Sequence, residues 1–130
     1  MQEHLKFSKL KSIALVAVRY EDWRDFRDLI EGIIKCPSIR QVIFNNMTFS
    51  ESNLLEPFKK LVTETRQLQE LDLSQCTFKS PKLSSGFFPV LANSKVWRFI
   101  MRETVIGPFE NLLMKAFFLT SQSVRYIDIS

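Results

Sequence analysis

Histidine and cysteine, the residues that most often act as bases, nucleophiles or metal ligands, are scarce in this 130-residue sequence. The one histidine, His4, has no partners for a zinc site or a Ser-His-Asp arrangement. Cys36 and Cys76 have no CxxC neighbour and no nearby histidine that could act as a base, so both are interpreted as structural. The three glycines are isolated and form no phosphate-binding loop. We therefore predict that the chain is not an enzyme and binds no metal or cofactor.

Composition predicts a globular chain with a mildly basic surface. Hydrophobic residues make up 45% of the sequence, and the formal net charge is +4. Basic residues fall on many segments with acidic residues between them, which predicts a solvated surface and argues against nucleic acid as a partner. The sequence has no secretory signal at its start and no apolar run long enough to span a membrane. We expect a cytoplasmic, reducing location with unpaired cysteines.

One spacing of apolar residues recurs along the whole chain. Each of the first four segments has apolar residues at its first, fourth, sixth and eleventh positions, and a fifth is cut off at Ser130, after its sixth position. Successive segments start 28 or 29 residues apart. The segments start at Leu10, Ile39, Leu68, Val96 and Val124. Leaving aside the ninth position, all nineteen framework positions are apolar, which chance would not produce in a chain of 45% apolar content.

The elements that repeat this spacing are a strand followed by a helix. The fourth and sixth positions alternate inward on a short strand, whereas the segments between strands have apolar residues at helical spacing. These helical stripes are Leu29, Ile30, Ile33 and Ile34; Phe58, Leu61 and Val62; Phe87, Phe88 and Leu91; and Leu112, Leu113, Ala116, Phe117 and Leu119. Pro57 and Pro108 suit first-turn positions, whereas Pro89 is expected to shorten its helix or to push it into irregular structure. This order predicts parallel strands with helices on one side.

The segments resemble the leucine-rich repeat L-x-x-L-x-L-x-x-N/C-x-L, and their period is that of the ribonuclease-inhibitor-like class. The third segment, with Cys76 at the ninth position, is the best match. The resemblance implies one α/β solenoid over residues 1–130, a horseshoe segment with strands on its concave face and helices on its convex face. Residues 1–9 look like the tail of a preceding repeat. Because the repeat runs off both ends, we expect a segment of a longer protein.

The ninth position closes the turn after each strand. Cys76 and Thr104 have side chains that can satisfy backbone groups there, whereas Val18 and Met47 do not. The first two turns are therefore expected to be less regular, or to be satisfied by backbone or water.

The third, fifth and seventh positions of each strand should point away from the core, onto the concave face. The first two strands place small and apolar residues there, which indicates either a covered surface or scattered surface apolarity. Further along, Glu70 should lie beside Arg98 and Asp72 near Arg102. These charges indicate either solvated ion pairs or a recognition patch with Arg98, Arg102 and Tyr126 as anchors. The candidate partner-binding residues are Ile43, Asn45, Glu70, Asp72, Ser74, Arg98, Ile100, Arg102, Tyr126 and Asp128.

These positions favour a protein-interaction scaffold that binds a protein partner, and no small-molecule substrate, through its concave face. Similar repeats occur in ribonuclease inhibitor, in nucleotide-binding immune receptors and in actin regulators such as tropomodulin and the capping-protein linker proteins, and the residues select none of them. One alternative is a regulatory repeat domain linked to an enzyme, as in GTPase-activating proteins and substrate adaptors of ubiquitin ligases. Another is a purely structural part of a large assembly.

Overall fold

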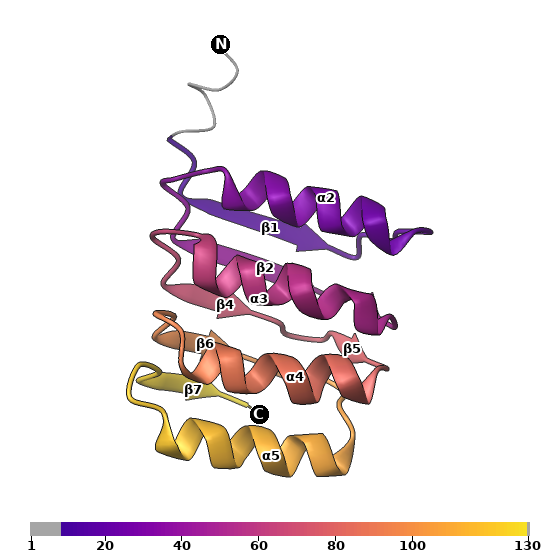
Figure 1. Cartoon of the computed structure of the whole chain (residues 1–130), viewed down its shortest axis with the longest axis vertical. Helices are drawn as coiled ribbons and strands as arrows, with labels where there is room; N and C mark the ends of the chain where they lie inside the picture. Colours follow the sequence, from indigo (N-terminus) through magenta and orange to yellow (C-terminus); the bar gives the residue numbers. More distant parts are fainter. Residues whose placement is uncertain (1–8, 130) are drawn as a thin grey trace.

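A computed structural model describes residues 9–129, and its main feature is a parallel sheet covered on one side by helices (Figure 1). The five strands lie in the order β1-β2-β4-β6-β7, and every neighbouring pair is parallel. Their bounds are β1 (Ser12–Val16), β2 (Gln41–Asn45), β4 (Glu70–Asp72), β6 (Arg98–Ile100) and β7 (Tyr126–Asp128). Apart from Lys9, the predicted tail of a preceding repeat lies outside the described residues.

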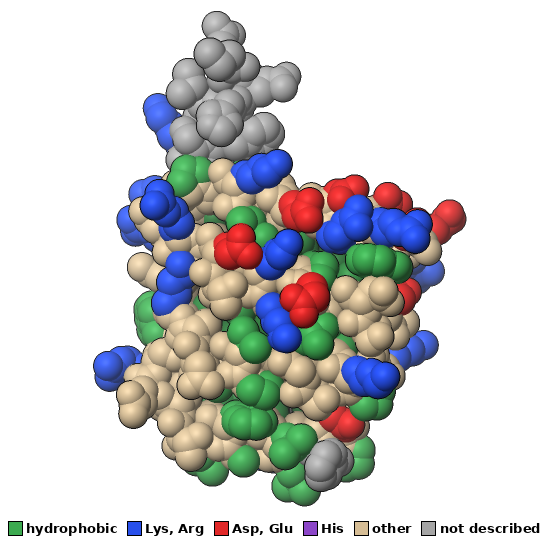
Figure 2. Space-filling model, in the orientation of Figure 1, with side chains coloured by type: hydrophobic (Ala, Val, Ile, Leu, Met, Phe, Trp, Pro, Cys, Tyr) green, Lys and Arg blue, Asp and Glu red, His purple; other side chains and the backbone are tan. Residues whose placement is uncertain are grey.

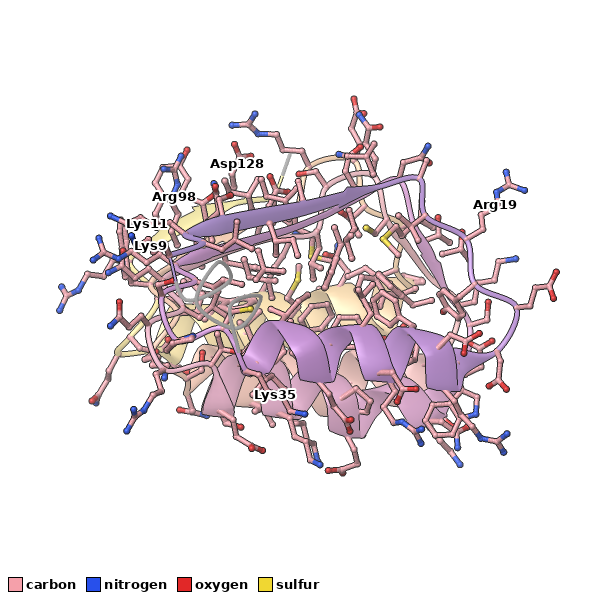
Figure 3. All side chains as sticks on the ribbon, turned by 90° about the horizontal axis from the view of Figure 1, so that it is seen from above. Lys9, Lys11, Arg19, Lys35, Arg98 and Asp128 are labelled. Carbon is pink, nitrogen blue, oxygen red and sulfur yellow. The ribbon has the colours of Figure 1, made fainter. Side chains whose placement is uncertain are left out.

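Helices alternate with these strands along the chain. They are α2 (Trp23–Ile34), α3 (Leu55–Glu64), α4 (Pro81–Ala92) and α5 (Pro108–Thr120), and a short 3-10 helix, η1 (Ser52–Leu54), leads into α3. Seen from above, the sheet forms one layer and the helices the other (Figure 3). The prediction of an α/β fold with parallel strands and helices on one side is confirmed.

The strand register places equivalent residues of the sequence pattern side by side. Ser12 pairs with Gln41, Gln41 with Glu70, Glu70 with Arg98, and Arg98 with Tyr126. After β2 and β4, the chain forms two further short strands, β3 (Thr48–Phe49) and β5 (Thr77–Phe78). These two strands pair as a second, two-stranded sheet, and Thr77 also bridges to Val105.

Phenylalanine fills the space between the sheet and the helices. Seven rings are almost fully buried, and their contacts run from Phe26 through Phe58 and Phe88 to Phe118. Each buried ring contributes about 1.5–3 kcal/mol relative to an exposed one. The core is therefore continuous through all the repeats.

Two expectations about the helices were wrong. Pro89 lies inside α4 without ending it, because Phe87, Phe88 and Leu91 on either side are buried and hold the helix against the core. In α5 the core residues are Met114 and Phe118, whereas Leu112, Ala116 and Leu119 of the predicted stripe are exposed. Since α5 is apolar on most sides, its sequence pattern could not select the buried face.

Candidate interaction surface

The face of the sheet opposite the helices, here called the open face, carries a row of polar contacts. The row consists of the third-position residues of the five strands: Ser12, Gln41, Glu70, Arg98 and Tyr126. Ser12 Oγ donates to Gln41 Oε1 at 2.7 Å, and Gln41 Nε2 donates to Glu70. Glu70 Oε1 lies 3.4 Å from Arg98 Nη1, so these two residues are neighbours, as predicted.

Arg98 is the most constrained residue of this row. Its guanidinium lies 4.7 Å from the centre of the Tyr126 ring, while Glu70 holds it from the other side. Its Nε is buried and has no hydrogen-bond partner within the described part of the chain. Because the Arg98 and Tyr126 side chains are fixed before any partner arrives, they would lose little conformational entropy on binding.

Arg102 makes a different contact from the one expected. Its Nε donates to Asp128 Oδ2 at 2.6 Å, on the neighbouring strand β7, rather than pairing with Asp72. The hydrogen bond with Asp128, and then the Asp128 charge, raise the pKa of Arg102. Asp72 Oδ1 instead accepts a hydrogen bond from the backbone N–H of Ser74 at 2.9 Å. Asp72 therefore stabilises the end of its own strand.

Two of the candidate binding residues, Ser74 and Ile100, are buried, with exposures of 8% and 7%. Strand β4 ends at Asp72, so Ser74 turns inward and its Oγ accepts from the Arg102 N–H at 3.2 Å. Ile100 lies between Asp72 and Asp128 of the adjacent strands in the sheet register. A partner would therefore contact the residues around Ser74 and Ile100 rather than these two side chains.

The remaining candidates lie on the open face with intermediate or full exposure. Asn45 donates from Nδ2 to the Ser74 carbonyl at 3.2 Å, and Ile43 beside it is half-buried. Tyr126 is 41% exposed and Arg102 is exposed. On β1 the face is apolar, with Val16 61% exposed. The apolar start and charged end predicted from the sequence thus lie on one continuous surface.

At the carboxyl ends of the strands, side chains close the turns. Cys76 Sγ donates to the Phe44 carbonyl at 3.0 Å, and Thr104 Oγ1 donates to the Leu73 carbonyl at 2.8 Å, as the ninth-position argument expected. Burial raises the pKa of the Cys76 thiol to about 11. The thiol is therefore protonated at neutral pH, which suits a structural hydrogen-bond donor and not a nucleophile.

The turns with Val18 or Met47 at the ninth position have the same backbone conformation as those with Cys76 or Thr104. Strands β1 and β2 pair over five residues, as far as Val16 and Asn45, whereas β4 and β6 pair over three. The residue before the ninth position has positive φ in every one of the four turns: Ala17 (55°), Asn46 (55°), Gln75 (60°) and Glu103 (53°). This backbone feature is therefore the same in all four turns, and in this respect the first two turns are not less regular than the others.

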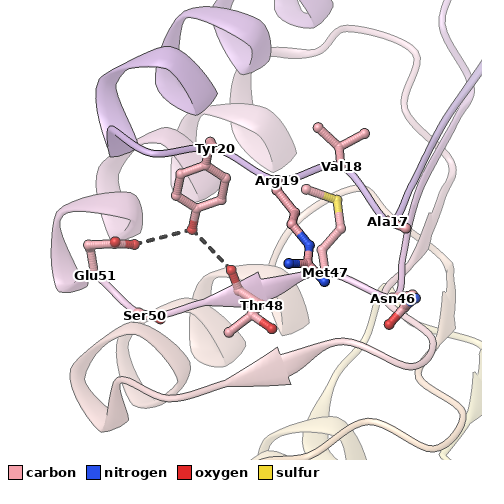
Figure 4. A pocket seen from close by; sticks show the side chains of 9 residues that line it. All are labelled: Ala17, Val18, Arg19, Tyr20, Asn46, Met47, Thr48, Ser50 and Glu51. Atoms are coloured by element: carbon pink, nitrogen blue, oxygen red, sulfur yellow. Dashed lines mark hydrogen bonds between the residues drawn. The ribbon is translucent and has the colours of Figure 1, made fainter.

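A recess that the sequence did not predict lies between the first two turns, lined by residues 17–20, 46–48, 50 and 51 (Figure 4). Its volume is about 440 Å³. The Tyr20 hydroxyl lies 3.1 Å from both the Thr48 carbonyl and Glu51 Oε2, and burial followed by the Glu51 charge raises the pKa of Tyr20. Through the Thr48 carbonyl, Tyr20 contacts β3, whose other neighbour in the second sheet is β5. The sequence feature that could have indicated the recess is the pair of apolar ninth-position residues, Val18 and Met47, which both line it.

Neither a metal-binding group nor a membrane-spanning helix is found among residues 9–129. No three histidine, cysteine, aspartate or glutamate side chains gather there in a metal-binding arrangement. No helix in that range is long and apolar enough to cross a bilayer.

Comparison with known proteins yields a likeness of fold. Neither the protein-family models nor the curated protein sequences contain a match to this chain. A solved structure of the tropomodulin C-terminal domain from Caenorhabditis elegans is similar, with a TM-score of 0.69 over 99% of this chain and 81% of that one. Sequence identity is 16%, so the likeness establishes a shared α/β fold and no more.

Proposed function

We propose that this chain is a non-enzymatic leucine-rich-repeat module of the ribonuclease-inhibitor-like class, which binds a protein partner through the open face of its sheet. The solenoid interpretation is supported by the 28- and 29-residue register of the paired strands. The similarity in fold to a tropomodulin C-terminal domain is compatible with it. A cytoplasmic location is part of the proposal, because a reducing environment suits two free cysteines.

The observation that carries the proposal is the arrangement of Arg98 and Tyr126. Arginine and tyrosine are enriched among the residues that dominate binding energy, especially when they are held in place by neighbours. Here Arg98 is held between Glu70 and the Tyr126 ring, and Tyr126 remains accessible. The core of the fold requires neither side chain, so their ordered arrangement is available for a partner.

The test compares two arginine–aromatic pairs on opposite sides of the molecule. Arg98 and Tyr126 lie on the open face, whereas Arg27 and Trp23 of α2 make a similar contact, 5.4 Å from guanidinium to ring centre, on the helix side. Immobilised wild type, Arg98→Ala/Tyr126→Ala and Arg27→Ala/Trp23→Ala would each be used to capture proteins from an extract of the source organism. Tyr126→Ser alone serves as a second variant, since it leaves the Arg98–Glu70 contact in place.

We expect proteins retained by the wild type and by the helix-side variant to be reduced at least about tenfold on the open-face variants. Quantitative mass spectrometry of the captured proteins measures this. Loss on the helix-side variant with retention on the open-face variants would contradict the proposal and assign binding to the helices. Equal retention by all variants would favour a purely structural role.

A further inference from the structure

The loops that lead into the strands, here called the entry loops, share a charge pattern. They comprise residues 9–11, 35–40, 65–69, 93–97 and 121–125, and they contain no aspartate or glutamate. Six exposed basic residues from them form what we call the basic edge: Lys9, Lys11, Arg40, Arg66, Lys95 and Arg125. The basic residues that looked dispersed in the sequence are brought to one edge because parallel strands all begin at the same edge.

The figures show this edge directly. Lys and Arg side chains line the left side of the space-filling view, without acidic side chains on the visible face there, whereas charges of both signs mix over α2 and α3 (Figure 2). Seen from above, Lys9 and Lys11 lie at the same edge as Arg98, while Arg19 lies at the opposite edge (Figure 3). Lys35, also from an entry loop, lies on the helix side (Figure 3).

Backbone hydrogen bonds fix the spacing along the edge. The Arg40 N–H donates to the Lys11 carbonyl, the Gln69 N–H to the Arg40 carbonyl, and the pattern continues through Trp97 to Arg125, with distances of 2.8–3.0 Å. Neighbouring strands lie about 4.8 Å apart, so the five loops span roughly 20 Å. The edge is therefore long and rigid enough to contact an extended ligand over several residues.

Within residues 9–129, ion pairs do not neutralise the positive charge of this edge. Among the described residues, none of the six takes part in an ion pair, since the five pairs present use other cations. Burial and then the neighbouring charge of Arg66 lower the pKa of Lys95. The acidic residues flanking one loop are Glu64 and Glu70, and Glu70 is already engaged by Arg98.

Helix ends account for part of this clustering but leave an excess. Helices α2 to α5 all end at this edge, where each macrodipole contributes about half of one negative charge. Four helix ends thus offset roughly two of the six positive charges. A net positive surface remains, which would attract an acidic ligand and speed its association.

Two exposed aromatic residues indicate which kind of acidic ligand fits. Trp97 is 42% exposed within the fourth entry loop, and Tyr126, 41% exposed, links the basic edge to the open face. Single-stranded nucleic acid would stack its bases on free ring faces, but Arg98 already covers one face of Tyr126. A peptide does not require a free ring face for base stacking, because its apolar side chains can pack against any exposed part of these rings.

We propose that the basic edge binds an acidic, extended protein segment whose apolar side chains pack on Trp97 and Tyr126. This inference rests on the proposed function, because the segment would belong to the protein held by the open face. The carboxylates lie along Lys11, Arg40, Arg66 and Arg125, and the rest of the partner continues onto the open face.

The test uses a fluorescently labelled peptide of glutamates with two interspersed leucines, titrated with the full chain and followed by anisotropy. The edge variant is Lys11→Gln/Arg40→Gln/Arg66→Gln/Arg125→Gln. The matched control, Lys60→Gln/Lys79→Gln/Lys82→Gln/Lys115→Gln, removes the same number of exposed charges elsewhere. The expected result is binding that weakens about tenfold in the edge variant, changes less than about threefold in the control, and decreases with salt.

Further arms identify the ligand class. Trp97→Ala should weaken the leucine-containing peptide about fivefold and leave an all-glutamate peptide of the same length unaffected. Oligo-uridylate and vesicles containing phosphatidylserine are tested in parallel. Tighter binding of either one than of the peptide would overturn the proposal in favour of nucleic acid or a membrane, and equal weakening by the edge and control variants would overturn it as non-specific attraction.

This experiment can fail independently of the proposed function. The peptide assay contains no native partner, so its failure removes the basic edge and leaves the open face untouched. If the edge variant loses the peptide while Arg98→Ala/Tyr126→Ala keeps every native partner, the open-face proposal falls. Binding of acidic peptide by the basic edge then stands, but its assignment to a partner held by the open face is contradicted.

Discussion

The two ends of each strand differ in what their side chains do. At the exit turns, residues 16–18, 45–47, 74–76 and 102–104, the backbone adopts positive φ and the side chains of Cys76 and Thr104 bond to carbonyls of the preceding repeat. At the entry loops, small hydroxyls such as Ser38 and Ser123 bond to the backbone, while the charged residues project into solvent. Hydrogen bonds thus link neighbouring repeats at both ends of the strands, and the charged side chains of the entry loops remain available for binding.

The largest effect expected from this contrast is at Cys76. Cys76→Ala should lower the free energy of unfolding by about 2–3 kcal/mol, because it removes a buried sulfur and leaves the Phe44 carbonyl without its donor. Val18→Ala, at the same position of the first repeat but 38% exposed, should cost less than about 1 kcal/mol. Urea unfolding at pH 7 measures both, and equal costs would remove the distinction between the turns.

The pH dependence of the unfolding free energy tests the same structural role of Cys76. The pKa of the Cys76 thiol is raised from 9.0 to about 11 by folding, so the stability it contributes is present below pH 9 and is lost as pH rises through 11. The difference in unfolding free energy between the wild type and Cys76→Ala should therefore shrink by up to about 2 kcal/mol over this range. A constant difference would show that the thiol is not protected by burial.

Thr104→Val tests the side-chain hydrogen bond of its exit turn, because valine has nearly the same volume as threonine. The substitution removes the hydroxyl that donates to the Leu73 carbonyl at 2.8 Å, and we expect a loss of about 1–1.5 kcal/mol in unfolding free energy. Thr77→Val, in which the hydroxyl makes none of the described hydrogen bonds, is the control and should change stability by less than about 0.5 kcal/mol. If Thr104→Val is equally neutral, the backbone alone closes this turn.

Positive φ at the exit turns predicts a stabilising substitution. Glu103 has φ 53°, and an L-residue with a Cβ is strained there, so Glu103→Gly should raise the unfolding free energy by about 0.5–1 kcal/mol. Asn46→Gly should change it little, because asparagine tolerates this conformation at φ 55°. Thermal unfolding of the two variants provides the comparison, and a destabilised Glu103→Gly would mean that its side chain has a structural role.

The smallest effect on stability is expected at the entry loops. Lys11→Gln, Arg40→Gln, Arg66→Gln and Arg125→Gln together should change the unfolding free energy by less than about 0.5 kcal/mol, since these exposed residues belong to none of the described ion pairs. Urea unfolding would be run on the same samples that are used for peptide binding. A loss as large as that of Cys76→Ala would show that the charged residues of the entry loops are structural.

Sequence alone predicted the parallel sheet because the apolar positions recur with a fixed period, and the same period placed Glu70 beside Arg98. It did not predict the burial of Ser74, which depends on β4 ending at Asp72. The basic edge was also missed, because residues such as Lys11 and Arg40 are 29 positions apart and become neighbours only through the strand register. Local spacing thus predicted the elements and the neighbours at equivalent positions, whereas strand ends and surface charge required the structure.

Side-chain footprinting with hydroxyl radicals, with and without a protein captured from the source organism, tests the role of the open face most directly. Tyr126 and Trp97 are 41% and 42% exposed on or beside the open face, whereas Leu112 and Leu119 are 67% and 87% exposed on α5. We expect the captured protein to protect Tyr126 and Trp97 from oxidation and to leave Leu112 and Leu119 unchanged. Protection of the two leucines with unchanged oxidation of Tyr126 and Trp97 would contradict binding through the open face.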